Sequence, residues 1–165
     1  MDKKYTINFN EKNIENWHLT NDDIMGGKSQ SEIIYDEDKH IFSGIISKEN
    51  NGGFSSIYQN IKQLSSGLNK VKLDLIGDGL TYQIRVYVLI DGYRLAYKHD
   101  FQTCAGKRQS LVFSLNDFTA TYRGQTLSGR GAVKSQDIIQ TGILITNEKP
   151  IGFTLKLLNL SFYKT

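Results

Sequence analysis

The chain of 165 residues carries a formal net charge of +3 and one cysteine, Cys104. This length fits one domain over residues 1–165. The mild and dispersed charge argues against a nucleic-acid binder. A lone cysteine excludes an intrachain disulfide, and we expect a buried or inert thiol. The N-terminus lacks a secretory signal and no apolar run reaches the ~20 residues of a membrane-spanning helix, so a cytoplasmic protein without a transmembrane segment is expected.

Two polar blocks, each with a Gly-Gly pair, come first along the chain: Asn21–Ser31 and Asn50–Ser56. Asp22 and Asp23 offer hard oxygen ligands that suit Ca²⁺, but their spacing is not that of an EF-hand. Turns that need Asx residues and glycine explain the same residues without a metal, and they explain Asn50 and Asn51 equally well. These four residues therefore stay candidate partner contacts, and no metal site is predicted. Phe54, after the second block, is expected to enter the core.

Alternation of apolar and polar residues predicts mostly strands. The strongest run is 82–90, and Asp91-Gly92 then predicts a tight hairpin, because both turn residues need positive φ. In the last strand, 153–162, the apolar phase shifts near Leu158, which predicts a bulge. Other strands are expected at 41–47, 54–59, 71–75, 93–101, 111–115 and 143–145, with short helices near 13–17 and 135–139. Many short strands with glycine turns predict an all-β fold, an antiparallel jelly-roll β-sandwich.

The predicted hairpin has one apolar and one polar face. Its register sets Ile84 opposite His99 on the apolar face, so His99 is expected to be a hydrogen-bonded core histidine. The polar face carries Gln83, Arg85, Tyr87 and Lys98. Because Arg85 and Lys98 lie opposite each other, an acid is expected beside them, and Asp100 and Asp74 are the candidates. This face is either a solvated mesh of ion pairs or a surface for a sugar or peptide, which planar aromatic rings beside hydrogen-bonding groups suit.

Motifs for catalysis or cofactor binding are weak in this chain. Gly77-Asp78-Gly79 lacks the third glycine of a dinucleotide fingerprint and lies between two strands. The three histidines have no metal-ligand spacing. The sequence therefore predicts no enzyme and no cofactor. The segment 122–134 holds Arg123 and Arg130 and no acid, so it is either a basic surface loop or a site for a phosphate, a lipid headgroup or an acidic partner.

Short motifs in a fixed order run through nearly the whole chain. They are Trp17, Asn21-Asp22-Asp23-Ile24-Met25-Gly26-Gly27-Lys28-Ser29, Asn50-Asn51-Gly52-Gly53-Phe54, Gly77-Asp78-Gly79 with Tyr82, Phe101-Gln102-Thr103, Leu115 with Asp117-Phe118, Arg123-Gly124, Gly142 with Leu144-Ile145, and Gly152-Phe153 with Leu155. This ordered set resembles the complex I intermediate-associated protein 30 family. The resemblance implies a galactose-binding-like jelly roll.

The same resemblance implies a non-catalytic binding or assembly module, like the members that assist assembly of respiratory complex I. Its partner would be a protein, such as a respiratory-complex subunit. The alternative is a carbohydrate-binding module that uses a concave polar-aromatic sheet face. Family members often carry Arg where this chain has Tyr58, so Tyr58 is a candidate contact residue without an implied anion-binding role.

Overall fold

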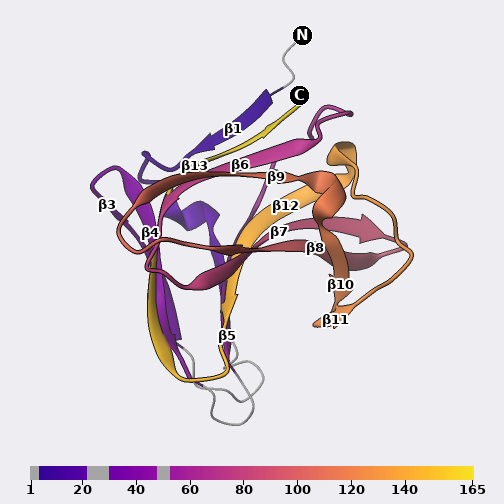
Figure 1. Cartoon of the computed structure of the whole chain (residues 1–165). Helices are drawn as coiled ribbons and strands as arrows, with labels where there is room; N and C mark the ends of the chain where they lie inside the picture. The colour runs from indigo at the N-terminus through magenta and orange to yellow at the C-terminus, as the bar shows by residue number, and fades with distance from the viewer. Residues whose placement is uncertain (1–3, 22–29, 48–52) are drawn as a thin grey trace.

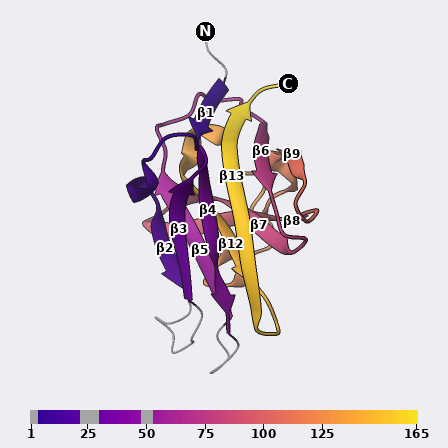
Figure 2. The ribbon, with the colours of Figure 1, turned by 90° about the vertical axis from the view of Figure 1, so that its left-hand side faces the viewer.

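The computed structural model describes residues 4–21, 30–47 and 53–165, which form two antiparallel sheets packed face to face (Figure 1). The first sheet has the order β3-β4-β13-β6-β9, with β1 also paired to β13. Its strands are β1 (Lys4–Asn8), β3 (Gln30–Asp36), β4 (Lys39–Ile46), β6 (Lys70–Ile76), β9 (Arg108–Ser114) and β13 (Ile151–Tyr163). Figure 2 shows β13 running between β4 and β6.

The second sheet has the order β11-β10-β8-β7-β12-β5-β2. Its strands are β2 (His18–Asn21), β5 (Phe54–Asn60), β7 (Thr81–Ile90), β8 (Tyr93–Gln102), β10 (Thr119–Tyr122), β11 (Gln125–Thr126) and β12 (Ile138–Thr146). The helical turns are η1 (Ile14–Asn16), η4 (Leu115–Asp117) and η5 (Ser135–Asp137). None of the helices in the described ranges is long and apolar enough to cross a membrane. The predicted jelly-roll β-sandwich is confirmed.

The core lies between the two sheets, where each strand contributes alternate residues. Leu73 and Leu155 of the first sheet and Ile84, Val86 and Ile143 of the second are all at most 1% exposed. The intervening residues of the second sheet therefore point to its outer face. This alternation decides which side chains are available to a ligand.

The predicted hairpin and bulge are both confirmed. Asp91 and Gly92 have φ values of 52° and 82°, and β7 pairs with β8 in the predicted register, with Arg85 opposite Lys98. The register of β13 on β6 shifts between Leu157 and Asn159, where the apolar phase of the sequence changes.

Three expectations about burial differ from the structure. Phe54 is half-buried and alternates with the core residue Ile57, so it lies on the outer face of β5 instead of in the core. His99 is only half-buried, although its Nδ1 hydrogen-bonds the Asp100 carbonyl at 2.7 Å and its ring packs on Phe113. Cys104 is exposed, because it follows β8 in a surface turn.

Asp78 joins the two sheets. It follows β6, and its carboxylate accepts hydrogen bonds from the Leu80 amide (3.1 Å), the Tyr82 hydroxyl (3.0 Å) and the Thr154 amide of β13 (2.7 Å). Burial, together with the negative charge of Asp78, raises the pKa of Tyr82. The Gly77-Asp78-Gly79 motif is therefore a structural clamp between strands.

A second buried network holds the segment before β2. Trp17 Nε1 donates to His40 Nδ1 at 2.9 Å, so the ring proton of neutral His40 lies on Nε2, which donates to the Glu11 carbonyl at 2.6 Å. His40 is 1% exposed, and this burial lowers its pKa. The neutral ring thereby fixes the turn that contains Glu11 against the sandwich.

Candidate functional site

The outer face of the second sheet brings side chains from four strands into one row. In the register, Gly142 of β12 lies between Arg85 of β7 and Tyr58 of β5, and His18 of β2 lies on the far side of Tyr58. Gly142 lets these strands approach closely, because a Cβ there would lie 2.2 Å from the carbonyl oxygen of Ile57. The row is thus open at its centre and lined by rings and a guanidinium.

Arg94 of β8 covers the aromatic rings of this row. Its guanidinium carbon lies 3.9 Å from the ring centroid of Tyr87 and 4.6 Å from that of Tyr58, and the two rings are 6.0 Å apart. His18 stacks on the other side of Tyr58 at 5.1 Å. Cations over aromatic faces are attracted by the ring quadrupole. As a result Tyr87 is only 4% exposed although it lies on the outer face.

Hydrogen bonds from amide side chains orient the arginines. Arg94 Nε donates to Gln140 Oε1 at 2.6 Å, and Gln140 Nε2 donates to Asn60 Oδ1 at 2.8 Å. Arg85 Nε donates to Gln83 Oε1 at 3.0 Å. These bonds engage the Nε edge of each guanidinium and leave the terminal nitrogens for a ligand. A guanidinium held in this way is prepared for a bidentate bond to a carboxylate or phosphate.

Three arginines line one pocket of about 400 Å³ on this face. Arg85 and Arg94 are joined there by Arg123, which follows β10 and has a φ of 50°. No carboxylate is among the residues that line the pocket, and within the described ranges none of the three makes an ion pair. We call Tyr58, Arg85, Tyr87, Arg94 and Arg123 the arginine–tyrosine face. Within the described ranges this face carries positive charge that no ion pair neutralises.

The structure brings together five of the predicted contact residues: Tyr58, Gln83, Arg85, Tyr87 and Lys98 all lie on the outer face. The expected acid is Asp100, which pairs with Lys98 at 3.3 Å. Asp74 is not near them, because β6 belongs to the other sheet, where Ser110 and Asn159 hydrogen-bond its carboxylate. The remaining four candidates, Asp22, Asp23, Asn50 and Asn51, lie outside the described residues.

Sequence reasoning missed Arg94, His18, Gln140 and Arg123 as members of this site. The register of the hairpin sets Arg94 opposite Leu89 on the polar face, but its contacts with Tyr58 and Gln140 depend on the order of β7, β12 and β5. A signal existed for Arg123, which lies in the basic segment without acids. The described residues include no cluster of three or more His, Cys, Asp and Glu side chains placed to hold a metal ion.

A family model described as complex I intermediate-associated protein 30 matches residues 7–157. The chain belongs to this family. The match includes every strand of the arginine–tyrosine face and nearly the whole of the sandwich. No curated protein sequence matches the chain.

Solved structures with the same fold are carbohydrate-binding modules and parts of larger enzymes. The family 11 module of the cellulosomal cellulase Lic26A-Cel5E of Clostridium thermocellum is 12% identical over 98% of this chain and 95% of the module, with a TM-score of 0.75. A family 11 module from the same organism was solved in complex with a β-1,3-1,4-mixed-linked tetrasaccharide. It is 13% identical over 98% of this chain and 96% of the module, with a TM-score of 0.70. The agarase AgWH50C is 13% identical over 99% of this chain and 25% of its own, with a TM-score of 0.65. At these identities the similarity shows the fold alone.

Proposed function

We propose that this protein is a non-catalytic assembly factor, or chaperone, for respiratory NADH:ubiquinone oxidoreductase, and that it holds an acidic segment of a protein partner on the arginine–tyrosine face. The observation that carries the proposal is the group of Arg85, Arg94 and Arg123 around one pocket that no carboxylate lines. Family membership supplies the respiratory complex as the setting. The geometry supplies the chemistry of the contact.

Partner binding suits the composition of this face. Arginine and tyrosine are the residues that most often dominate the free energy of protein interfaces. Arg94 is held in place by Tyr87 and Gln140 before any partner arrives, so little side-chain entropy is lost on binding. A partner carboxylate would meet the terminal nitrogens of a fixed guanidinium.

The same face gives no support to catalysis. Guanidinium groups stay protonated and are not general bases, and the amide side chains around them neither give up nor take a proton near neutral pH. A tyrosine hydroxyl and two oriented arginines are sufficient to bind, but they provide no activated nucleophile. We infer that the site recognises a partner without altering it.

Carbohydrate binding at this face is the second candidate, because several solved structures of the same fold are carbohydrate-binding modules. A sugar ring stacks on an open aromatic face. Here Arg94 covers Tyr87, which is 4% exposed, so a sugar would have to displace the guanidinium first. This cost ranks the carbohydrate function below the protein partner.

Affinity purification of the tagged protein from its native host tests the proposal. The wild type should retain subunits of the NADH dehydrogenase, and Arg94→Ala should reduce this retention by about tenfold or more. Arg130→Ala is the matched control, since Arg130 is an exposed arginine that does not line the pocket. Retention by the wild type should fall as salt is raised, because the contact is between exposed charges.

Equal retention by Arg94→Ala and the wild type would contradict this role for the face. Affinity electrophoresis in a gel with soluble β-1,3-1,4-glucan tests the second candidate. Slowed migration of the wild type, lost in Tyr87→Ala, would favour carbohydrate binding at this face over the protein partner, because the sugar would stack on the Tyr87 ring.

A further inference from the structure

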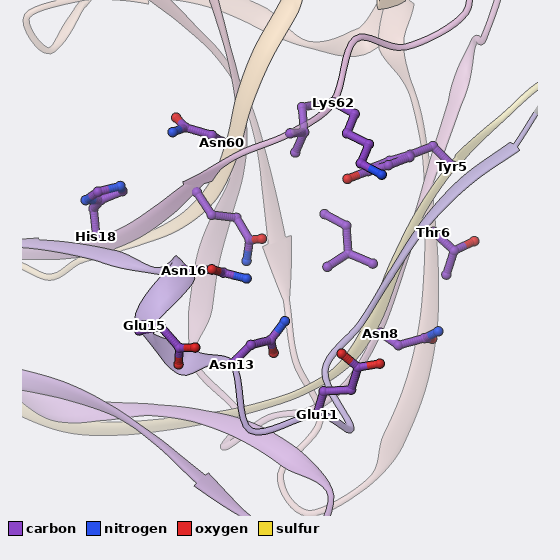
Figure 3. A pocket seen from close by; sticks show the side chains of 13 residues that line it. Tyr5, Thr6, Asn8, Glu11, Asn13, Glu15, Asn16, His18, Asn60 and Lys62 are labelled. Atoms are coloured by element: carbon purple, nitrogen blue, oxygen red, sulfur yellow. The ribbon is translucent and has the colours of Figure 1, made fainter.

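A second pocket lies at the edge of the sandwich, and five of its thirteen lining residues carry amide side chains: Asn8, Asn13, Asn16, Gln59 and Asn60. Its volume is about 680 Å³. Figure 3 shows the side chains of Tyr5, Asn13, Asn16 and Lys62 pointing into it, whereas Thr6, Asn8 and Asn60 lie on its rim and point away. We call this the amide pocket. Neither the family description nor the arginine–tyrosine face accounts for it.

Gln59 is the first sign that the amide pocket receives a ligand. It alternates with Tyr58, so it points inward, and it is 6% exposed while lining the pocket. No described residue hydrogen-bonds its side-chain amide. Its amide atoms are accessible from the pocket, because Asn13 Oδ1 alone among the described side-chain atoms is both fully buried and unpaired. Gln59 therefore presents two free donors and one free acceptor to the pocket.

Asn13 is the second, independent sign. It occupies the N-cap of η1, where an asparagine oxygen usually accepts a hydrogen bond from the helix, but its side chain makes no such bond. Its Oδ1 is buried and has no hydrogen-bond partner among the described residues. The wall of the pocket thus contains a buried acceptor without a partner, beside the accessible amide of Gln59.

The walls of the amide pocket are held in place from outside it. His40 fixes the backbone at Glu11 through the hydrogen bond to its carbonyl, and Trp17 fixes His40. On the other wall, Gln140 donates to Asn60 Oδ1. A pocket whose walls are already anchored binds a ligand without much loss of conformational entropy.

The polar groups of the pocket select a neutral ligand rich in hydroxyls. Glu11 and Glu15 would repel an anion, and because Glu11, Glu15 and Lys62 are all exposed, their charges are solvated and none of them requires a charged ligand. The amide of Gln59 needs both a donor and an acceptor, and Asn13 Oδ1 needs a donor, a combination that hydroxyl groups satisfy. Ile7 and Ile61 add an apolar wall, against which the carbon–hydrogen groups of such a ligand can pack.

We propose that the amide pocket binds a neutral saccharide of one or two rings, through Gln59 and Asn13. The volume lies within the range of small-molecule sites, about 300–1,000 Å³. This inference stands apart from the proposed protein partner, because Arg94 does not line the amide pocket and neither Gln59 nor Asn13 belongs to the arginine–tyrosine face.

The test is a two-dimensional ¹H–¹⁵N NMR titration of the whole chain with maltose, cellobiose, lactose and xylobiose, and with ethanolamine as a cationic probe. At least one disaccharide should shift the side-chain NH₂ signals of Gln59 and Asn13. Gln59→Met should weaken that binding about fivefold or more. The matched control, Gln102→Met, replaces an exposed glutamine outside the pocket and should bind as the wild type does. Arg94→Ala should also leave the affinity unchanged.

Thermal unfolding of Gln59→Met separates a ligand role from a structural one. Because the side chain of Gln59 makes no hydrogen bond to a described residue, the melting temperature of Gln59→Met should equal or exceed that of the wild type. A lower melting temperature would mean that Gln59 serves the fold, and would overturn the proposal. Shifts with ethanolamine alone, no shifts with any disaccharide, or unchanged affinity in Gln59→Met would overturn it too.

Discussion

The clamp made by Asp78 gives a stability prediction whose magnitude follows from the structure. Its carboxylate accepts three hydrogen bonds, from two backbone amides and from the Tyr82 hydroxyl, which belongs to a residue only 1% exposed. Each such bond contributes about 1 kcal/mol net. Asp78→Ala should therefore lower the free energy of unfolding by about 3 kcal/mol, which corresponds to about 6–12 °C in melting temperature for a chain of this size.

Urea unfolding followed by the fluorescence of Trp17, the single tryptophan, measures this free energy. Asp78→Asn keeps one acceptor oxygen and should lose about half as much as Asp78→Ala. Tyr82→Phe removes one of the three bonds, so a double-mutant cycle with Asp78→Ala should give a coupling energy of about 1 kcal/mol. The control is Asp36→Ala, at an exposed aspartate. If Asp78→Ala costs no more than this control, the clamp does not join the sheets as we describe.

Two further predictions concern the second sheet and the buried histidine. Gly142→Ala should lower the free energy of unfolding by about 1–3 kcal/mol, because the new Cβ would lie 2.2 Å from the Ile57 carbonyl oxygen. The control Gly152→Ala should be nearly neutral, because its new Cβ would lie 3.8 Å from the nearest atom. Equal losses of stability for the two variants in chemical denaturation would refute this prediction. Since the folded-state pKa of His40 lies below its ordinary 6.5, stability should be full above that value and fall as pH drops through 6.5 toward the lowered pKa. The measurement is the difference between the urea unfolding midpoints at about pH 7.5 and at about pH 5.5. This difference should be smaller in His40→Gln than in the wild type. The control His18→Gln, at an exposed histidine, should keep the wild-type difference.

Local patterns were sufficient to predict the central hairpin and the bulge of β13. Asp91-Gly92 specifies its own turn, and the turn fixes the register of β7 on β8, so Arg85, Tyr87 and Lys98 were assigned to one face. The fold class followed from the same alternation. These features depend on residues that are close in sequence.

The rest of the site depends on strands that are distant in sequence. Arg94 meets Tyr58 and Gln140 only because β12 pairs with both β7 and β5, which alternation does not specify. Phe54 was wrongly expected in the core, because the more apolar positions of β5, 54 and 58, are those that face outward.

Strand β5 carries consecutive residues of two different sites, with Tyr58 facing the arginines and Gln59 facing the amide pocket. Such an arrangement has an evolutionary consequence. Substitutions at Tyr58 and at Gln59 can change the two sites one at a time, since these two side chains point to opposite faces of the sheet. An insertion or deletion of one residue within β5 would turn every following side chain to the opposite face. The two sites can therefore diverge independently by substitution, but a change in the length of this strand would remove both at once.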